Sequence, residues 1–134
     1  MTYLLDTSVL SRLGSSPVRL RVQQLDGSGL ARTSMTDLEV GFSARNGAEW
    51  DRLAAAVGAF VLVEVEARHF DRARQVQRLL AEDGLRGRKV PDLLIAAVAE
   101  AEGLIVLHYD VDFDHIASVT GQAVEWIVAR GSID

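Results

Sequence analysis

The chain has 134 residues, of which 49% are hydrophobic and 25% are charged, and this balance predicts one globular domain spanning residues 1–134. Its formal net charge of -5 argues against broad electrostatic binding to nucleic acid, although a nucleic-acid substrate stays open. The absence of cysteine excludes disulfides, thiolate metal sites and a cysteine nucleophile, so a metal would need oxygen or histidine ligands.

The N-terminal segment, residues 1–6, lacks the basic start and the long apolar core of a signal peptide. No apolar run in the sequence approaches the roughly 20 residues that a membrane span needs. We therefore expect a cytoplasmic protein with no membrane partner.

The first half of the chain alternates short apolar runs with helical patterns. The segment 36–45 fits either a strand or a helix, and Thr36-x-x-Glu39 favours a helix because it matches a capping box. The expected elements are a strand at 3–5, helical stretches from 7 and over 18–25, a strand at 30–34, and helices at 36–45 and 49–57.

The second half of the chain contains the longest periodic patterns. The expected elements are a strand at 60–65, a helix at 67–82, a helix at 93–101, a strand at 104–108, a short helix at 113–118 and a strand at 123–128. The helix at 93–101 is apolar almost all round, which predicts a central position. Strands that alternate with helices predict an α/β fold with a central, mostly parallel sheet flanked by helices.

Four segments place a carboxylate where a predicted strand ends or a predicted helix begins. The acids are Asp6, Glu39, Asp92 and the pair Asp110 and Asp112. Each one alone is explained by helix capping or a solvated turn. Because sites in parallel α/β sheets form beyond the carboxyl ends of the strands, we expect the acids to share one pocket.

Carboxylates gathered in one pocket repel each other unless they hold a cation, and Mg²⁺ or Mn²⁺ prefers oxygen ligands. Asp6, Asp92, Asp110 and Asp112 are the predicted metal ligands, and with Glu39 they form the predicted catalytic set. Such a metal would activate a water and neutralise a phosphoryl oxygen, and an acid outside its shell would orient the water. The predicted reaction is therefore phosphodiester hydrolysis.

Two neighbouring features leave alternatives open. Asp37 competes with Glu39, because helical spacing separates the two by about 200° and only one can face the pocket. Arg86, Arg88 and Lys89 form either an ordinary solvated loop or a clamp for substrate phosphates. His108 is predicted to be structural rather than a ligand.

These segments resemble the PIN-domain ribonucleases, specifically the VapC toxins of bacterial toxin–antitoxin pairs. The resemblance covers nearly the whole chain, through YLLDTSV at 3–9, TDLEVGFSAR at 36–45, KVPDLLIAAVA at 89–99 and HYDVDFDHIA at 108–117. It implies a PIN-like three-layer fold and a Mg²⁺-dependent endoribonuclease. The matching acids are Asp6, Glu39, Asp92 and Asp110, with Asp112 assisting.

The resemblance also implies partners and substrate contacts. They are an RNA substrate, a cognate VapB-type antitoxin and a second copy of the chain in a homodimer. The hydroxyl of Thr7 or Ser8 corresponds to the family's polar residue beside the first acid. Ser8 is accordingly predicted, with the basic loop, to contact the substrate.

Two other functions fit parts of the sequence. In a phosphatase of the haloacid dehalogenase type, Asp110 would attack phosphorus and Asp112 would protonate the leaving group. The late position of this motif and the Phe113-Asp114 pair that follows it count against this function. A PIN-like binding module that no longer cleaves ranks lower, because all the main acids are present.

Overall fold

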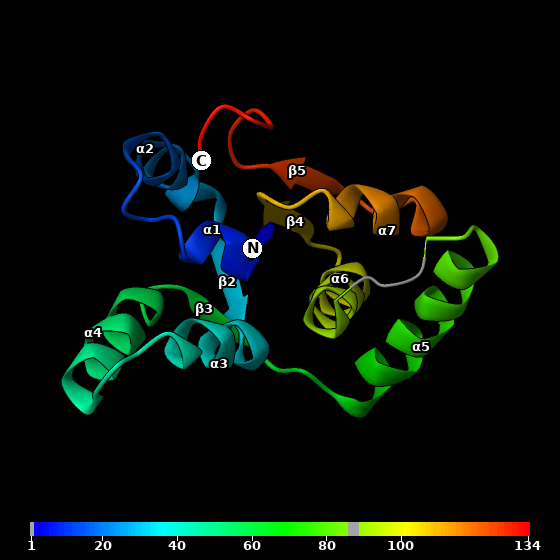
Figure 1. Ribbon diagram of the computed structural model, residues 1–134, viewed down its shortest axis with the longest axis horizontal. Helices are drawn as coiled ribbons and strands as arrows, with labels where there is room; N and C mark the ends of the chain where they lie inside the picture. The colour runs from blue at the N-terminus through cyan, green and yellow to red at the C-terminus, as the bar shows by residue number, and fades with distance from the viewer. Residues whose placement is uncertain (1, 86–88) are drawn as a thin grey trace.

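The computed structural model describes residues 2–85 and 89–134 (Figure 1). Over these residues five strands form one sheet in the order β3-β2-β1-β4-β5, and every neighbouring pair is parallel. The strands are β1 (Tyr3–Leu5), β2 (Leu30–Thr33), β3 (Val61–Val63), β4 (Ile105–His108) and β5 (Val124–Trp126). The expected α/β fold with a parallel sheet is confirmed.

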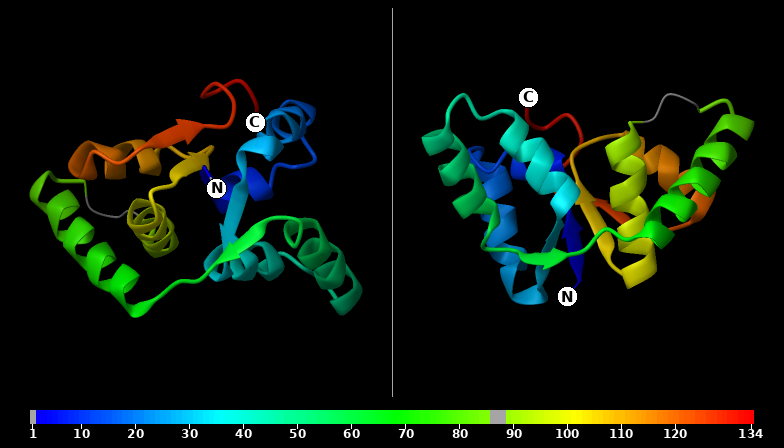
Figure 2. Two further views of the ribbon diagram at one scale, coloured as in Figure 1. Left: turned by 180° about the vertical axis from the view of Figure 1, so that it is seen from behind. Right: turned by 90° about the horizontal axis from the view of Figure 1, so that it is seen from below.

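Helices cover both faces of the sheet. They are α1 (Thr7–Leu10), α2 (Ser16–Leu25), α3 (Ser34–Phe42), α4 (Gly47–Val57), α5 (Ala67–Glu82), α6 (Val90–Glu102) and α7 (Asp112–Thr120), with a 3₁₀ turn, η1 (Asp26–Ser28). Figures 1 and 2 show α5, α6 and α7 gathered on one side and α1 and α2 on the other. Across the described residues no helix combines the length and the apolar character that a membrane crossing requires.

The central strands β1 and β4 contribute side chains to two hydrophobic cores, one on each face of the sheet. Leu4 and Val106 lie in the core shared with α5, α6 and α7, whereas Leu5 and Leu107 lie in the core shared with α1 and α2. Successive side chains of a strand point to opposite faces, so adjacent apolar residues serve different cores. Both strands are therefore buried on both faces, as parallel strands between helix layers must be.

Helix α6 occupies the central position that its composition predicts. Residues 93–99 are all buried, and Pro91 lies in the first turn, where its missing N–H costs nothing. The helix ends at Gly103, whose left-handed φ of 68° suits glycine. A rigid, buried helix therefore carries Asp92 in its first turn.

Helix α5 departs from the burial that its sequence predicts. The apolar residues at 70, 73, 76, 79 and 80 predict one buried face, but Phe70 is 48% exposed and the adjacent His69 is buried. The buried stripe of α5 runs through 69, 73, 76 and 80, at spacings of four, three and four. The polar His69 fits this stripe because its Nδ1 accepts a hydrogen bond from the backbone N–H of Glu66, at 2.8 Å.

Helix α3 begins earlier than its sequence pattern predicts. The capping box is formed by Thr33 and Thr36, which each accept a hydrogen bond from the other's backbone N–H at 3.2 Å. The predicted Thr36 and Glu39 box was therefore wrong. Because the strand β2 ends at Thr33, the helix starts at Ser34, and the Glu39 side chain is not used to cap it.

Candidate active site

Asp6 and Asp110 lie at the same carboxyl edge of the sheet, as the sequence predicts. Asp6 follows β1 directly, and its backbone N–H donates to the carbonyl of Leu107 at 3.0 Å, which extends the pairing of β1 with β4. Asp110 lies two residues beyond the end of β4. The adjacency of the two central strands therefore brings together acids more than 100 positions apart in the sequence.

Asp92, Asp110 and Asp112 form the compact part of the cluster. Each offers a carboxylate oxygen, and these three oxygens lie within 4.8 Å of one another. Asp92 is delivered by α6, and Asp112 by the first turn of α7. Asp6 acts on this group electrostatically, because its charge helps raise the pKa of Asp92.

Burial sets the protonation of the two innermost acids. Asp6 and Asp92 are 3% and 4% exposed. Burial, followed by the charge of Asp6, raises the pKa of Asp92 to about 8. Burial also raises the pKa of Asp6, although hydrogen bonds from Ser8 oppose the change. Although the charge of the nearby Lys89 lowers the pKa of Asp92, Asp92 without a bound metal ion therefore keeps its proton near neutral pH.

The cluster has the donors that a hard divalent cation needs. Oδ1 of Asp6 and Oδ2 of Asp92 are buried and have no hydrogen-bond partner among the described residues. Buried polar atoms nearly always make a hydrogen bond, so two carboxylate oxygens without one in a single acidic cluster indicate a further positive partner. Oxygen ligands of this kind fit Mg²⁺ or Mn²⁺.

Lys89 supplies positive charge at the outer side of the cluster. Its Nζ lies 2.8 Å from Oδ2 of Asp110 and 3.9 Å from Oδ2 of Asp92. Burial favours a higher pKa for Asp110, but the hydrogen bond from Lys89 and one from the Asp112 N–H prevail and lower that pKa. The other two predicted phosphate contacts, Arg86 and Arg88, lie outside the described residues.

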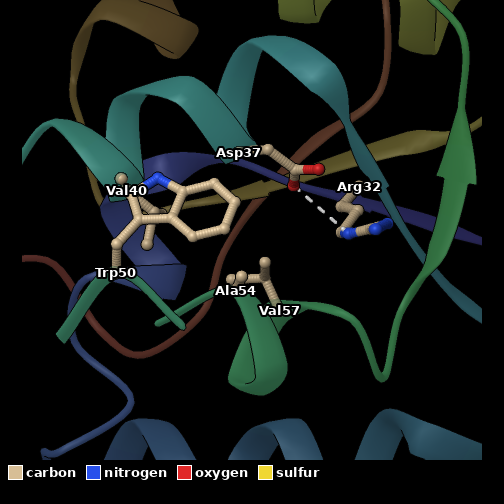
Figure 3. A pocket seen from close by; sticks show the side chains of 7 residues that line it. Arg32, Asp37, Val40, Trp50, Ala54 and Val57 are labelled. Carbon is tan, nitrogen blue, oxygen red and sulfur yellow. Dashed lines mark ion pairs between the residues drawn. The ribbon is translucent and has the colours of Figure 1, made fainter. Parts of the chain in front are cut away.

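Glu39, and not Asp37, faces the α1 side of the site. The hydroxyl of Thr7 donates to Oε1 of Glu39 at 2.7 Å, so Glu39 is held beside the residue that follows Asp6. Asp37 lies on another side of α3, where its Oδ1 is 3.2 Å from Nε of Arg32. Figure 3 shows this ion pair in a separate pocket between α3 and α4, beside Trp50.

The different positions of Glu39 and Asp37 predict different effects of two matched substitutions, one on the cleavage rate and one on the stability of the fold. Glu39→Gln keeps an oxygen for the Thr7 hydroxyl but removes the charge, and we expect the cleavage rate to fall roughly 100-fold. Asp37→Asn should leave the cleavage rate near wild type and lower the free energy of unfolding by about 1 kcal/mol, because the mostly buried Arg32 loses its charged partner. Cleavage assays and denaturant melts check both; loss of cleavage in Asp37→Asn alone would contradict the assignment.

Ser8 holds the ends of β1 and β4 together. Its hydroxyl donates to Oδ2 of Asp6 at 2.5 Å and accepts from the N–H of Tyr109 at 2.8 Å, while its own N–H also donates to Asp6. These contacts fix the rotamer of Asp6 against the strand that precedes Asp110. A contact between Ser8 and the substrate stays a prediction.

His108 orients the turn that carries Asp110. It is fully buried between the rings of Phe113 and Trp126, and its Nδ1 accepts from the N–H of Asp110 at 3.1 Å. Burial lowers the pKa of His108 to about 4, so the ring is neutral at physiological pH. The sequence indicated a structural role, but this contact with Asp110 was not foreseen. The available signal was a polar residue at the end of an otherwise apolar strand.

The orienting role of His108 is testable with two variants. In His108→Asn, the side-chain oxygen can replace Nδ1 as the acceptor, whereas His108→Leu leaves the Asp110 N–H without that partner. We expect the leucine variant to bind Mn²⁺ roughly tenfold more weakly than wild type and the asparagine variant to recover most of the affinity. Calorimetric titration measures the affinity, and thermal melts control for folding. Equal losses in both variants would show that only packing matters.

Comparisons with known proteins agree with this geometry. The PIN domain family matches residues 3–119. Ribonuclease VapC51 of Mycobacterium tuberculosis is 58% identical over 135 residues, covering 100% of this chain and 98% of that protein. The structure of DNA-bound VapBC from Salmonella typhimurium matches with a TM-score of 0.76 at 20% identity, over 96% of this chain and 99% of the other.

A second solved structure extends the comparison at higher sequence identity. VapBC-5 of Mycobacterium tuberculosis, a member of the VapBC family of toxin–antitoxin systems, matches with a TM-score of 0.61 at 27% identity, over 96% of this chain and 98% of the other. The family match covers most of the chain, and the similarity to VapC51 extends over all of it. The chain therefore belongs to the PIN domain family, among its VapC ribonucleases.

Proposed function

We propose that this chain is the toxin of a type II toxin–antitoxin pair and that it hydrolyses RNA phosphodiester bonds as a metal-dependent endoribonuclease. The observation that carries the proposal is the cluster of Asp92, Asp110 and Asp112 beside buried Asp6, with two carboxylate oxygens that have no hydrogen-bond partner among the described residues. The similarity to VapC51, a ribonuclease, supports RNA as the substrate class.

The proposed roles follow from the positions of the side chains. Asp6, Asp92, Asp110 and Asp112 would hold the cation, for which we propose Mg²⁺, with Mn²⁺ as a substitute. When bound, the ion would supply charge that lowers the pKa of a water and stabilises the scissile phosphate in the transition state. Glu39, held by Thr7, would orient or deprotonate the attacking water.

Other residues support these acids. Ser8 fixes Asp6, and His108 fixes the turn of Asp110. Lys89 is proposed to contact substrate phosphates, and the same role is proposed for Arg86 and Arg88, which lie outside the described residues. Such contacts would position the RNA without reading its sequence.

The partner of the chain is a VapB-type antitoxin, since the structural neighbours include VapBC complexes. We further propose a homodimer, a single domain over residues 1–134 and a cytoplasmic location. Leu38 and Phe42 on α3 are 72% and 91% exposed, and they border the same hollow as Thr7 and Glu39. Exposed apolar side chains beside a functional site favour a protein partner there.

The two alternatives lose support. The phosphatase alternative needs Asp110 as an attacking nucleophile, whereas Oδ2 of Asp110 is paired with Lys89 and the carboxylate lies in a group with Asp92 and Asp112 that fits a metal ion. The relatives of the chain are ribonucleases, not phosphatases. A binding module without activity is disfavoured because every acid of the predicted set is present.

RNA cleavage by the purified chain, free of antitoxin, tests the proposal when total RNA is incubated with the chain in Mg²⁺ or in EDTA. Asp110→Asn is compared with Asp114→Asn, the same chemical change four residues further along, at an acid that accepts from the Trp126 indole. We expect Mg²⁺-dependent cleavage by wild type and Asp114→Asn, and a rate lower by roughly 1,000-fold in Asp110→Asn. Cleavage in EDTA, or full activity of Asp110→Asn, would refute the mechanism.

A further inference from the structure

Lys89 is the single lysine of the chain, since every other residue of the Lys and Arg class is arginine. Its ammonium nitrogen lies 2.8 Å from Oδ2 of Asp110 and 3.9 Å from Oδ2 of Asp92. We propose that Lys89 is a resident counter-cation of the acidic cluster and that a divalent metal ion binds by displacing it. This inference rests on the metal-dependent function proposed above.

The charge of Lys89 neutralises the cluster only in part. The Lys89 ammonium donates a hydrogen bond to Asp110, but at 3.9 Å it is too far from Asp92 to donate one there. Oδ2 of Asp92 has no other hydrogen-bond partner among the described residues. One ammonium therefore faces several carboxylates. The excess negative charge keeps the cluster attractive to a divalent ion while the lysine is present.

The two sides of this contact differ in how easily they can move. The Lys89 side chain is 62% exposed, whereas those of Asp92 and Asp110 are 5% and 17% exposed. Lys89 is also the N-cap residue of α6, so its backbone is tied to the helix and its four-carbon side chain is free to rotate. The ammonium can move into water while the carboxylates stay in place.

Lysine suits this exchange better than arginine would. An ammonium is a compact point charge on a flexible stem, whereas a guanidinium is a planar fork that pairs with a carboxylate through two parallel hydrogen bonds. A compact cation matches the position of a metal ion and makes fewer contacts that must be broken. Once displaced, the ammonium stays within one side-chain length of the cluster, where a phosphate would be held. Metal binding would thereby release Lys89 for the substrate.

The single lysine permits a direct test on the intact chain. Reductive methylation with ¹³C-formaldehyde converts Lys89 to dimethyllysine, which keeps its positive charge, and leaves one side-chain NMR signal beside that of the N-terminal amine. We expect Mg²⁺ to shift this signal to the chemical shift that it has in the unfolded chain. The midpoint of the shift should equal the midpoint of metal binding measured by calorimetry. Sodium chloride at equal ionic strength should not move it. Metal binding that leaves the signal unchanged would overturn the proposal.

Substitutions give a second, independent test. Lys89→Met removes the competitor, and we expect it to bind Mn²⁺ roughly tenfold more tightly than wild type, whereas Lys89→Arg should bind no more tightly than wild type. Arg45→Met is the control for net charge, because Arg45 is 86% exposed and paired with Glu49. Affinity of Lys89→Met equal to or below that of wild type, or an equal gain in Arg45→Met, would overturn the proposal.

The two proposals fail in distinguishable ways. A chain that binds metal with release of Lys89 but cleaves no RNA refutes the ribonuclease function and leaves the displacement intact. A chain that cleaves RNA with Mg²⁺ while the Lys89 signal stays fixed refutes the displacement alone.

Discussion

Asp92→Asn is expected to slow RNA cleavage strongly and, in the same protein, to stabilise the metal-free fold. Asp92 is buried, and its pKa is raised to about 8 in the folded chain, against about 3.9 for an unfolded carboxyl. A carboxyl whose pKa is higher in the folded chain than in the unfolded chain makes its full contribution to the free energy of unfolding at a pH below the unfolded-state pKa. The contribution is lost as the pH rises through the folded-state pKa, because the buried group must then ionise. Asparagine has no charge to bury, so its advantage over aspartate grows from about pH 4 to pH 8.

We expect the gain in the free energy of unfolding to reach about 2 kcal/mol at pH 8 in EDTA, and the cleavage rate to fall roughly 1,000-fold. Thermal melts from pH 5 to pH 9, with EDTA or with Mg²⁺, measure the first quantity. Mg²⁺ should stabilise wild type and have little effect on the variant. Asp114→Asn, half-exposed and outside the cluster, is the control and should show neither effect. A variant that is less stable than wild type at pH 8 in EDTA would contradict the burial of a charge at this position.

Metal affinity is expected to rise with pH, by roughly tenfold per unit below pH 8, and to level off above it. A cation must replace the proton that Asp92 keeps below its pKa of about 8, so binding releases about one proton in this range. The raised pKa of Asp6 acts in the same direction. Calorimetric titration of Mn²⁺ in buffers with different ionisation enthalpies counts the protons released.

The matched control for this pH dependence is Asp92→Asn. Without the titrating carboxyl, its weaker affinity for Mn²⁺ should lose most of its dependence on pH between 6 and 8. An affinity of wild type that is flat over the same range would mean that Asp92 is already ionised in the metal-free chain. Burial would then not control its protonation.

Much of the fold could be predicted because the strongest patterns are local. Each central strand is a short apolar run, and residues 93–99 are apolar on every side, so their burial follows from composition. The start of α3 could not be predicted in this way. Thr33-x-x-Thr36 and Thr36-x-x-Glu39 are overlapping capping patterns. The choice between them depends on β2 pairing with β3 as far as Thr33, which pairs with Val63.

The candidate site shows the same division between local and tertiary information. Strand ends place Asp6 and Asp110 at one edge, and the sequence alone predicts this. The choice between Glu39 and Asp37 depends on partners from other elements, Thr7 in α1 and Arg32 in β2. The choice between His69 and Phe70 as the buried residue is a similar case. It depends on the packing of α5 on α6, which a local pattern does not contain.

The pairing of β1 with β4 has a consequence for the order in which activity arises during protein synthesis. Asp6 is made about 100 residues before its partner Leu107, whose carbonyl accepts from the Asp6 N–H, and the same separation applies to Ser8 and Tyr109. These contacts are far apart in sequence and form only after most of the chain is made. A nascent chain therefore has an incomplete set of acids until Asp110 and Asp112 have been made and β4 has paired with β1. Unfinished chains, including those from ribosomes that stop early, carry no assembled nuclease site.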